Sequence, residues 1–191
     1  QRETCARMLR QFGRTEDHIY AELVARTGML LDGAGDGAQL LALANQAVEG
    51  RPDDAVCRTT LGAVLYRTGQ MDEALTHLEA AQRLAEKSGS APTLSSIPLA
   101  CFLALAHHRQ GNREEAAHWL SRASAATAPP RVAVWRLSGA LPDWTWRAAG
   151  DVLQREAESV LSTAPDDGQP ALAAREDLAD TDSPAQEEPP P

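Results

Sequence analysis

Two short motifs in this chain place a ring side chain directly before an arginine, namely Tyr66-Arg67 and His108-Arg109. A guanidinium group can hold a carboxylate through two parallel hydrogen bonds, and a neighbouring ring can stack against a bound chain. This chemistry suits the binding of an extended peptide. The alternative is that both arginines are solvated helix ends, where positive charge offsets the helix dipole.

Motifs for catalysis and for metal binding are weak or missing. His107, His108 and His118 could suggest a metal, but zinc sites usually take four ligands with cysteine or carboxylate among them, so packing between helices is favoured. The sequence lacks G-x-S-x-G, H-E-x-x-H, a phosphate-binding loop and the kinase signatures H-R-D and D-F-G. We therefore expect no catalytic residue, no metal and no cofactor, and a chain that is not itself an enzyme.

The first ring–arginine pair belongs to a stretch, residues 60–85, whose apolar side chains recur with helical spacing on both sides of Gly69. A glycine can adopt a positive φ, which ends one helix and starts a turn. Small residues, Gly62 and Ala74, would let the two backbones approach closely. The stretch therefore predicts an antiparallel helical hairpin.

The spacing of this hairpin occurs two more times. Downstream it recurs at Leu103, Gly111, Ala116, Leu120 and Ala123. Upstream, a third copy falls 34 residues earlier than the hairpin, at Gly28, Leu40, Ala44 and Ala47. The pattern predicts three helical units at about residues 21–54, 55–88 and 97–130, with an eight-residue insertion before the last.

A period of 34 residues with a central glycine and small residues at fixed distances resembles the tetratricopeptide repeat (TPR). Over roughly residues 3–161 the order of segments is similar to the C-terminal TPR regions of large multidomain bacterial proteins, which often carry a Ser/Thr protein kinase domain or a β-propeller. The resemblance implies an all-α fold, a right-handed array of helical hairpins of the TPR-like α-solenoid type.

We expect one TPR-like domain over residues 1–161. Residues 1–20 would form a partial unit, with a helix over 2–12 that is the second of a pair, and residues 143–161 a final helix that caps the array. Its predicted apolar face carries Trp146, Leu153, Ala157 and Val160, and that of the helix over 16–31 carries Ile19, Leu23, Val24 and Met29. Residues 162–191 hold eight acids, one base and six prolines, which predicts a disordered tail of net charge −7.

By the TPR resemblance, the first helix of each unit lines a concave groove, which here would display Val56, Thr59, Ala63, Tyr66, Arg67, Cys101, Leu105, His108 and Arg109. We therefore expect a protein-interaction module that binds a peptide segment or a neighbouring domain there, including one from the same chain. The alternative is a regulatory or docking C-terminal segment of a bacterial Ser/Thr protein kinase whose catalytic domain lies upstream.

Charge and cysteine usage narrow the partner class and the compartment. Without the tail, 19 acids and 17 bases leave a net charge of −2, which argues against a nucleic acid partner. The three cysteines are far apart and form no C-x-x-C pair, and no apolar run is long enough to span a membrane. These features predict a cytoplasmic protein without a membrane segment. Because the chain starts with Gln1, we expect it to be a fragment.

Overall fold

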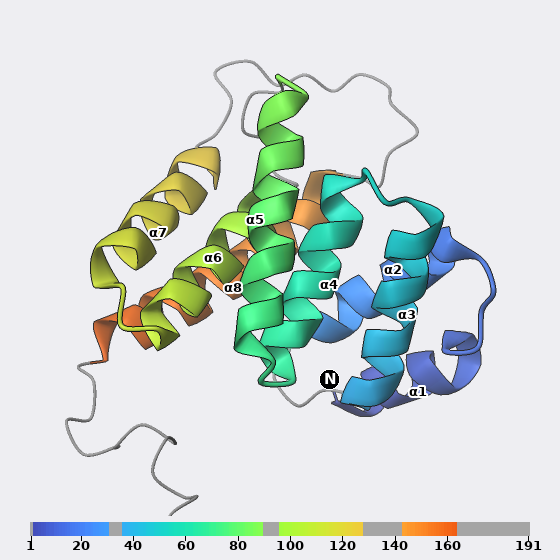
Figure 1. Cartoon of the computed structure of the whole chain (residues 1–191). Helices are drawn as coiled ribbons and strands as arrows, with labels where there is room; N and C mark the ends of the chain where they lie inside the picture. Colours follow the sequence, from blue (N-terminus) through green and yellow to red (C-terminus); the bar gives the residue numbers. More distant parts are fainter. Residues whose placement is uncertain (1, 31–35, 90–95, 128–142, 164–191) are drawn as a thin grey trace, which may run out of the picture.

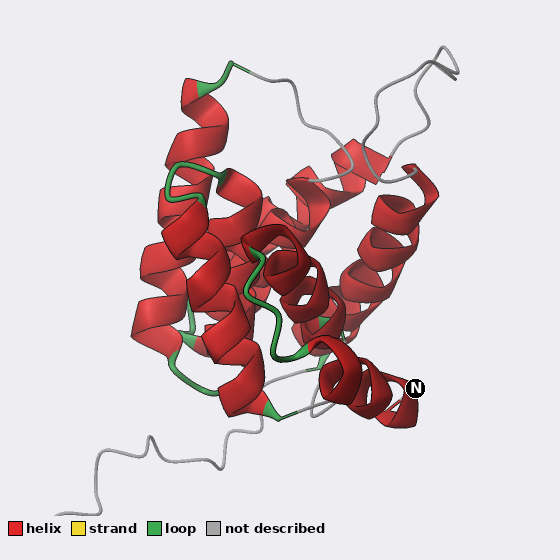
Figure 2. Ribbon diagram, turned by 90° about the vertical axis from the view of Figure 1, so that its right-hand side faces the viewer, coloured by secondary structure: helices red, strands yellow, loops and turns green. Residues whose placement is uncertain are grey.

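The computed structural model describes residues 2–30, 36–89, 96–127 and 143–163, and these residues form eight α-helices (Figure 1). The helices are α1 (Arg2–Phe12), α2 (His18–Met29), α3 (Gly37–Gly50), α4 (Ala55–Arg67), α5 (Met71–Lys87), α6 (Ile97–Arg109), α7 (Arg113–Thr127) and α8 (Asp143–Ser162). The part of the chain that the structure describes contains no strand (Figure 2). The predicted all-α, TPR-like array of helical hairpins is confirmed, and the predicted tail over 162–191 lies almost wholly outside the described residues.

The helices pack in a repeating order. α2 pairs with α3, α4 with α5, and α6 with α7. Each first helix of a pair also packs on the next one, α2 on α4 and α4 on α6, and each second helix packs on the first helix of the following pair. This nearest-neighbour stacking is how a helical repeat buries faces that a single hairpin would leave in water.

The turns inside the second and third hairpins have the same geometry. Gly69 has a φ of 84° and Gly111 a φ of 81°, the left-handed conformation that was predicted for Gly69. The residue after each glycine donates its N–H back across the turn, Gln70 to Leu65 O and Asn112 to His107 O, both at 2.9 Å. This is the Schellman ending of a helix, and it explains why glycine stands at this position.

Close contact between the backbones of α4 and α5 depends on small residues. A Cβ added to Gly62 would lie 2.7 Å from Leu78 Cγ and 3.1 Å from the carbonyl oxygen of Ala74. Both Leu78 and Ala74 are fully buried. The predicted close approach of the two helices at Gly62 is thus present, and leucine fills the space beside it.

Aspartates begin three of the helices. Asp17, Asp36 and Asp54 each accept hydrogen bonds from two backbone N–H groups in the first turn of α2, α3 and α4. Such caps satisfy donors that have no partner inside the helix. Asp36 was predicted to do so from its place before the helix.

The buried side of α2 differs from the predicted one. Ile19 is 56% exposed, whereas Ala21, Val24, Ala25 and Met29 are buried. At 100° per residue, Ile19 lies nearly opposite Ala21 on the helix. The helix turns its small residues toward α3 and α4, which leaves Ile19 in solvent, so its predicted place on the apolar face is wrong.

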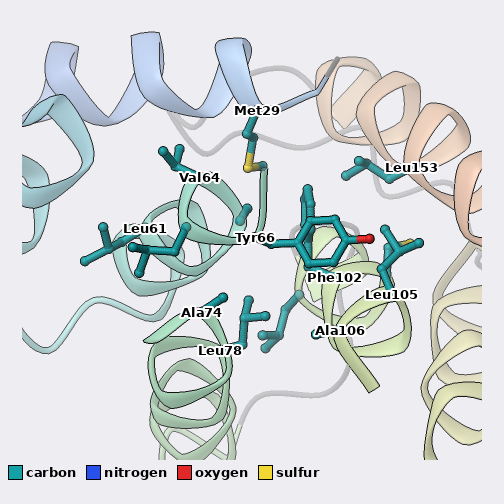
Figure 3. Packing of buried hydrophobic residues seen from close by; sticks show 14 of the residues in the cluster. Met29, Leu61, Val64, Tyr66, Ala74, Leu78, Phe102, Leu105, Ala106 and Leu153 are labelled. Atoms are coloured by element: carbon teal, nitrogen blue, oxygen red, sulfur yellow. The ribbon is translucent and has the colours of Figure 1, made fainter. Parts of the chain in front are cut away.

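The helices α4 and α6 form the centre of the molecule and are buried nearly all round. Every residue of α6 from Ile97 to Ala106 is buried, as are most residues of α4. A helix that is apolar on all sides belongs in an interior. The centre of the core lies between these two helices and is filled by Tyr66, Phe102 and Leu105 (Figure 3).

Candidate interaction surface on the inner face

We call the inner face the side of α4 and α6 that carries Tyr66, Arg67, Cys101 and Leu105. It corresponds to part of the predicted groove, and α8 packs on its α6 side and reaches its α4 side through Glu156. α8 packs on α6 and α7, and its Leu153 and Ala157 are fully buried. Figure 3 shows Leu153 pointing toward the side of α6 that carries Phe102 and Leu105. The inner face is therefore occupied and is not an open groove.

Arg67 fastens α8 to the inner face. Its two terminal nitrogens donate to the two carboxylate oxygens of Glu156 on α8, one of them at 2.6 Å. Its Nε donates to the backbone oxygen of Met29 at 3.0 Å, at the end of α2. The side chain of Arg67 is only 9% exposed and that of Glu156 is 28% exposed. This arginine therefore connects α2, α4 and α8, and it is not the solvated helix end that the alternative interpretation predicted.

The aromatic rings of Tyr66 and Phe102 lie beside Arg67 on the inner face. Tyr66 is 3% exposed and meets the ring of Phe102 edge to face, with centroids 5.7 Å apart. The guanidinium of Arg67 lies 5.2 Å from the Phe102 centroid, and that of Arg109 lies 4.6 Å from the Tyr66 centroid. The first ring–arginine pair is therefore inside the fold, whereas Arg109 of the second pair is at the surface.

The other predicted groove residues fall into two groups. Ala63, Cys101 and Leu105 have no exposed area. Thr59 is buried, and its hydroxyl donates to the Ala55 carbonyl within α4, while Val56 and His108 are partly exposed. The structure brings Tyr66, Arg67 and Arg109 together and places Val56 and Thr59 nearer the start of α4.

Two residues of the site were not predicted, Glu156 and the glycine that lets α8 approach α6. A Cβ on Gly150 would lie 3.1 Å from Cγ2 of Ile97, so a side chain there would require Ile97 or α8 to shift. Glu156 stands three residues after Leu153 and one before Ala157, on the predicted apolar face of the helix. That position was the available signal for a carboxylate directed inward. Val160 of the same face is partly buried, and the side chain of Trp146 lies outside the described residues.

A buried ionic group links α2 to α4 at the other end of the inner face. Glu22 is 6% exposed, accepts a hydrogen bond from the Thr60 hydroxyl at 3.1 Å and pairs with Arg26 at 3.0 Å. Burial raises the pKa of Glu22, and the charge of Arg26 acts against that rise. The charge of Arg26 thus offsets only part of the cost of burying the Glu22 carboxylate in the array.

The cysteines and histidines lack the surroundings of reactive groups. Burial raises the pKa of Cys57 to about 11 and that of Cys101 to about 12, so both thiols are protonated at neutral pH. Nδ1 of His77 and Nδ1 of His107 are buried without a hydrogen-bond partner. Burial is the main cause of the lowered pKa of His77. Within the described ranges, no three His, Cys, Asp or Glu side chains come close enough to hold a metal ion.

Comparison with known proteins identifies the repeat. Residues 53–127 match the tetratricopeptide repeat family. This segment spans α4 to α7, the two hairpins that share the same glycine turn. Neither the curated proteins nor the solved structures gave a match to the chain. Among the described helices, none combines the length and apolar composition that crossing a membrane requires.

Proposed function

We propose that this chain is a protein-interaction module whose inner face binds a polypeptide segment in helical form. TPR arrays mediate protein–protein interaction, and their stacked first helices form extended binding surfaces. The observation that carries the proposal is the bidentate pair between Arg67 and Glu156, which holds an amphipathic helix on that surface.

The contacts of α8 supply both affinity and selectivity for a helix. Burying one leucine such as Leu153 contributes about 1.5–3 kcal/mol. The planar guanidinium of Arg67 matches a carboxylate with two hydrogen bonds, which fixes where along the helix the acid must stand. This arrangement is the helix-in-groove mode of recognition, in which apolar anchors at i and i+4 enter a groove. We assign the contacts to Tyr66, Arg67, Cys101 and Leu105 among the predicted residues.

A charge-reversal cycle in the full chain tests this function. Leu153→Asp places a charge where an apolar side chain is buried, so α8 should leave the inner face. A fluorescent peptide of residues 143–163 should then bind this variant in trans. Adding Arg67→Glu to the chain should weaken binding at least about 10-fold, and Glu156→Arg in the peptide should restore it.

Arg83→Glu, on α5, is the control, because the side chain of Arg83 is 66% exposed and lies away from the inner face. It should change the Kd of the peptide by no more than about 3-fold. Far-UV circular dichroism should show that each variant keeps its helices. A peptide that does not bind the Leu153→Asp chain, or that binds equally well after Arg67→Glu, would contradict the proposed function.

We infer a polypeptide rather than a nucleic acid as partner, because the net charge of residues 1–161 is −2. A role as the docking segment of a bacterial Ser/Thr protein kinase is supported by sequence resemblance alone. The coding sequence upstream of Gln1 tests that role, since a kinase domain there would be needed for it.

A further inference from the structure

We propose that α8 is a removable occupant of the inner face, and that an amphipathic helix of another protein binds there in its place, a proposal that rests on the function proposed above. Such a helix would carry a leucine, a carboxylate three residues later and a small residue four residues later, as α8 does at Leu153, Glu156 and Ala157. α8 would thus keep the face closed until a competing helix arrives.

α8 is the peripheral member of the array. Over residues 147–162, whose side chains the structure describes, one side of α8 is buried and the opposite side is exposed, with polar residues at Asp151, Arg155 and Glu158. By contrast, α4 and α6 are enclosed by neighbours on nearly all sides. The contacts among the three hairpins do not involve α8. Removing α8 would therefore leave the packing of the hairpins in place.

The connection between α7 and α8 is longer than any other connection between consecutive helices. Three residues, 68–70, join α4 to α5, and three residues, 110–112, join α6 to α7. Fifteen residues, 128–142, join α7 to α8, a covalent length of at most about 50 Å when extended. A short connection would force the next helix into its place in the stack. A connection of this length leaves the position of α8 to be decided by its own contacts.

Without α8, the inner face would present an apolar surface and the guanidinium of Arg67 without its carboxylate partner. Cys101 and Leu105 have no exposed area now, and Arg67 would lose its carboxylate. A newly exposed apolar patch with the guanidinium of Arg67 at its edge selects a helix that has an apolar side and an acid on it. An acid at the wrong position along the helix would leave Arg67 without a partner.

A tethered competitor has a measurable effect on affinity. A segment linked to its site typically has an effective concentration on the order of millimolar. If a free helix of the same sequence has an intrinsic Kd of about 10 μM, the tethered α8 reduces its apparent affinity about 100-fold. Weakening α8 alone should therefore tighten the binding of an external helix by about that factor.

The experiment weakens α8 while leaving Arg67 and Glu156 intact. Gly150→Leu in the full chain would collide with Ile97 of α6 and push α8 away. Val152→Leu is the matched control, because it places the same side chain on the exposed side of α8. The peptide of residues 143–163 should bind the Gly150→Leu chain about 100-fold more tightly than the wild-type and Val152→Leu chains. The same peptide with Glu156→Arg should lose most of this affinity.

Alkylation of cysteines by iodoacetamide measures the opening of α8 directly. Cys101 is buried on α6, and the carboxylates of Glu156 and Glu158 are close enough to affect its thiol. Cys57 is equally buried, on α4. Cys101 should be alkylated at least about 10-fold faster in Gly150→Leu, with Cys57 unchanged. A parallel rise at Cys57 would mean that α8 leaves only when the whole array unfolds, which would overturn the proposal.

Two further outcomes would also overturn it. Equal peptide affinity for the wild-type and Gly150→Leu chains would show that α8 does not compete, although the proposed function would survive. A wild-type chain that is dimeric by light scattering and loses its dimer on adding peptide would show that α8 comes from a second copy. Failure of the peptide to bind the Leu153→Asp chain would instead contradict the proposed function itself. If Gly150→Leu does not fold, Leu153→Asp takes its place in both measurements.

Discussion

Arg67 and Arg109 show how one sequence motif can have two different environments. Each stands last in a first helix, directly after a ring, and three nitrogen atoms of Arg67 have defined partners on α2 and α8. Arg109 is exposed and rests on the Tyr66 ring. The difference follows from position in the array, because α8 brings the carboxylate of Glu156 to Arg67 at the end of α4.

This difference predicts unequal losses on truncation. Arg67→Ala would leave Glu156 without its partner and the Met29 carbonyl without its donor, so we expect a loss of about 2 kcal/mol in the free energy of unfolding. Arg109→Ala removes an exposed ring contact and should cost less than about 1 kcal/mol. Urea denaturation of both variants measures this. Similar losses for the two would show that Arg67 is not held as described.

Glu22 predicts a dependence of stability on pH. Burial raises its pKa above the usual 4.5, so folding favours the protonated acid. The stabilising contribution is full below about pH 4.5 and is lost as pH rises through the folded-state pKa. Glu22→Gln stays neutral, so the wild type should lose stability relative to this variant between pH 4.5 and about pH 8.

The urea concentration at the midpoint of unfolding, determined at about pH 4.5 and at about pH 8, measures this loss of stability. Glu79→Gln is the control, because the side chain of Glu79 is 50% exposed beside Arg83. The difference in urea midpoint between the Glu79→Gln variant and the wild type should be nearly the same at the two pH values. A Glu22→Gln variant that behaves in the same way would mean that the carboxyl of Glu22 is not buried in solution.

At the scale of the element, the glycine turns predict a purely conformational cost. No atom lies within 4 Å of a Cβ placed on Gly69, so a larger side chain would have room. The φ of 84° is nevertheless unfavourable for a β-branched residue. Gly69→Val should therefore lower stability by about 1–3 kcal/mol in a thermal melt. A variant that melts with the wild type would contradict the left-handed turn.

The helices and their turns could be predicted from the sequence because they depend on local signals. Helical spacing, the Asp36 cap and the glycine at the turn each act within a few residues, and all three are present in the structure. The buried side of α2 was harder to predict from the sequence, because it depends on which neighbouring helices Ala21 and Val24 contact. The sequence does not contain this information in a local signal, so Ile19 was wrongly predicted to lie on the apolar face of α2.

At the scale of the whole molecule, the occupied inner face could be anticipated only in part. The unbroken apolar run of α6, residues 97–106, leaves no polar side for a solvent-lined groove, and this signal was present in the sequence. The pairing of Arg67 with Glu156 joins residues 89 positions apart, and no repeat spacing predicts it. The position of α8 was therefore decided by tertiary contacts rather than by the period of the array.

The near burial of Arg67 also determines how the molecule responds to ionic strength. Salt screens exposed charges over about 10 Å at about 0.1 M, but it screens a pair shielded by protein much less. The alkylation rate of Cys101 should therefore change less than about 3-fold between about 50 mM and about 500 mM NaCl. A large acceleration by salt would show that the pair is solvated. If the Arg67–Glu156 pair stays shielded, changes in the electrolyte around the protein cannot expose the inner face. Its exposure then depends on a competing polypeptide that displaces α8.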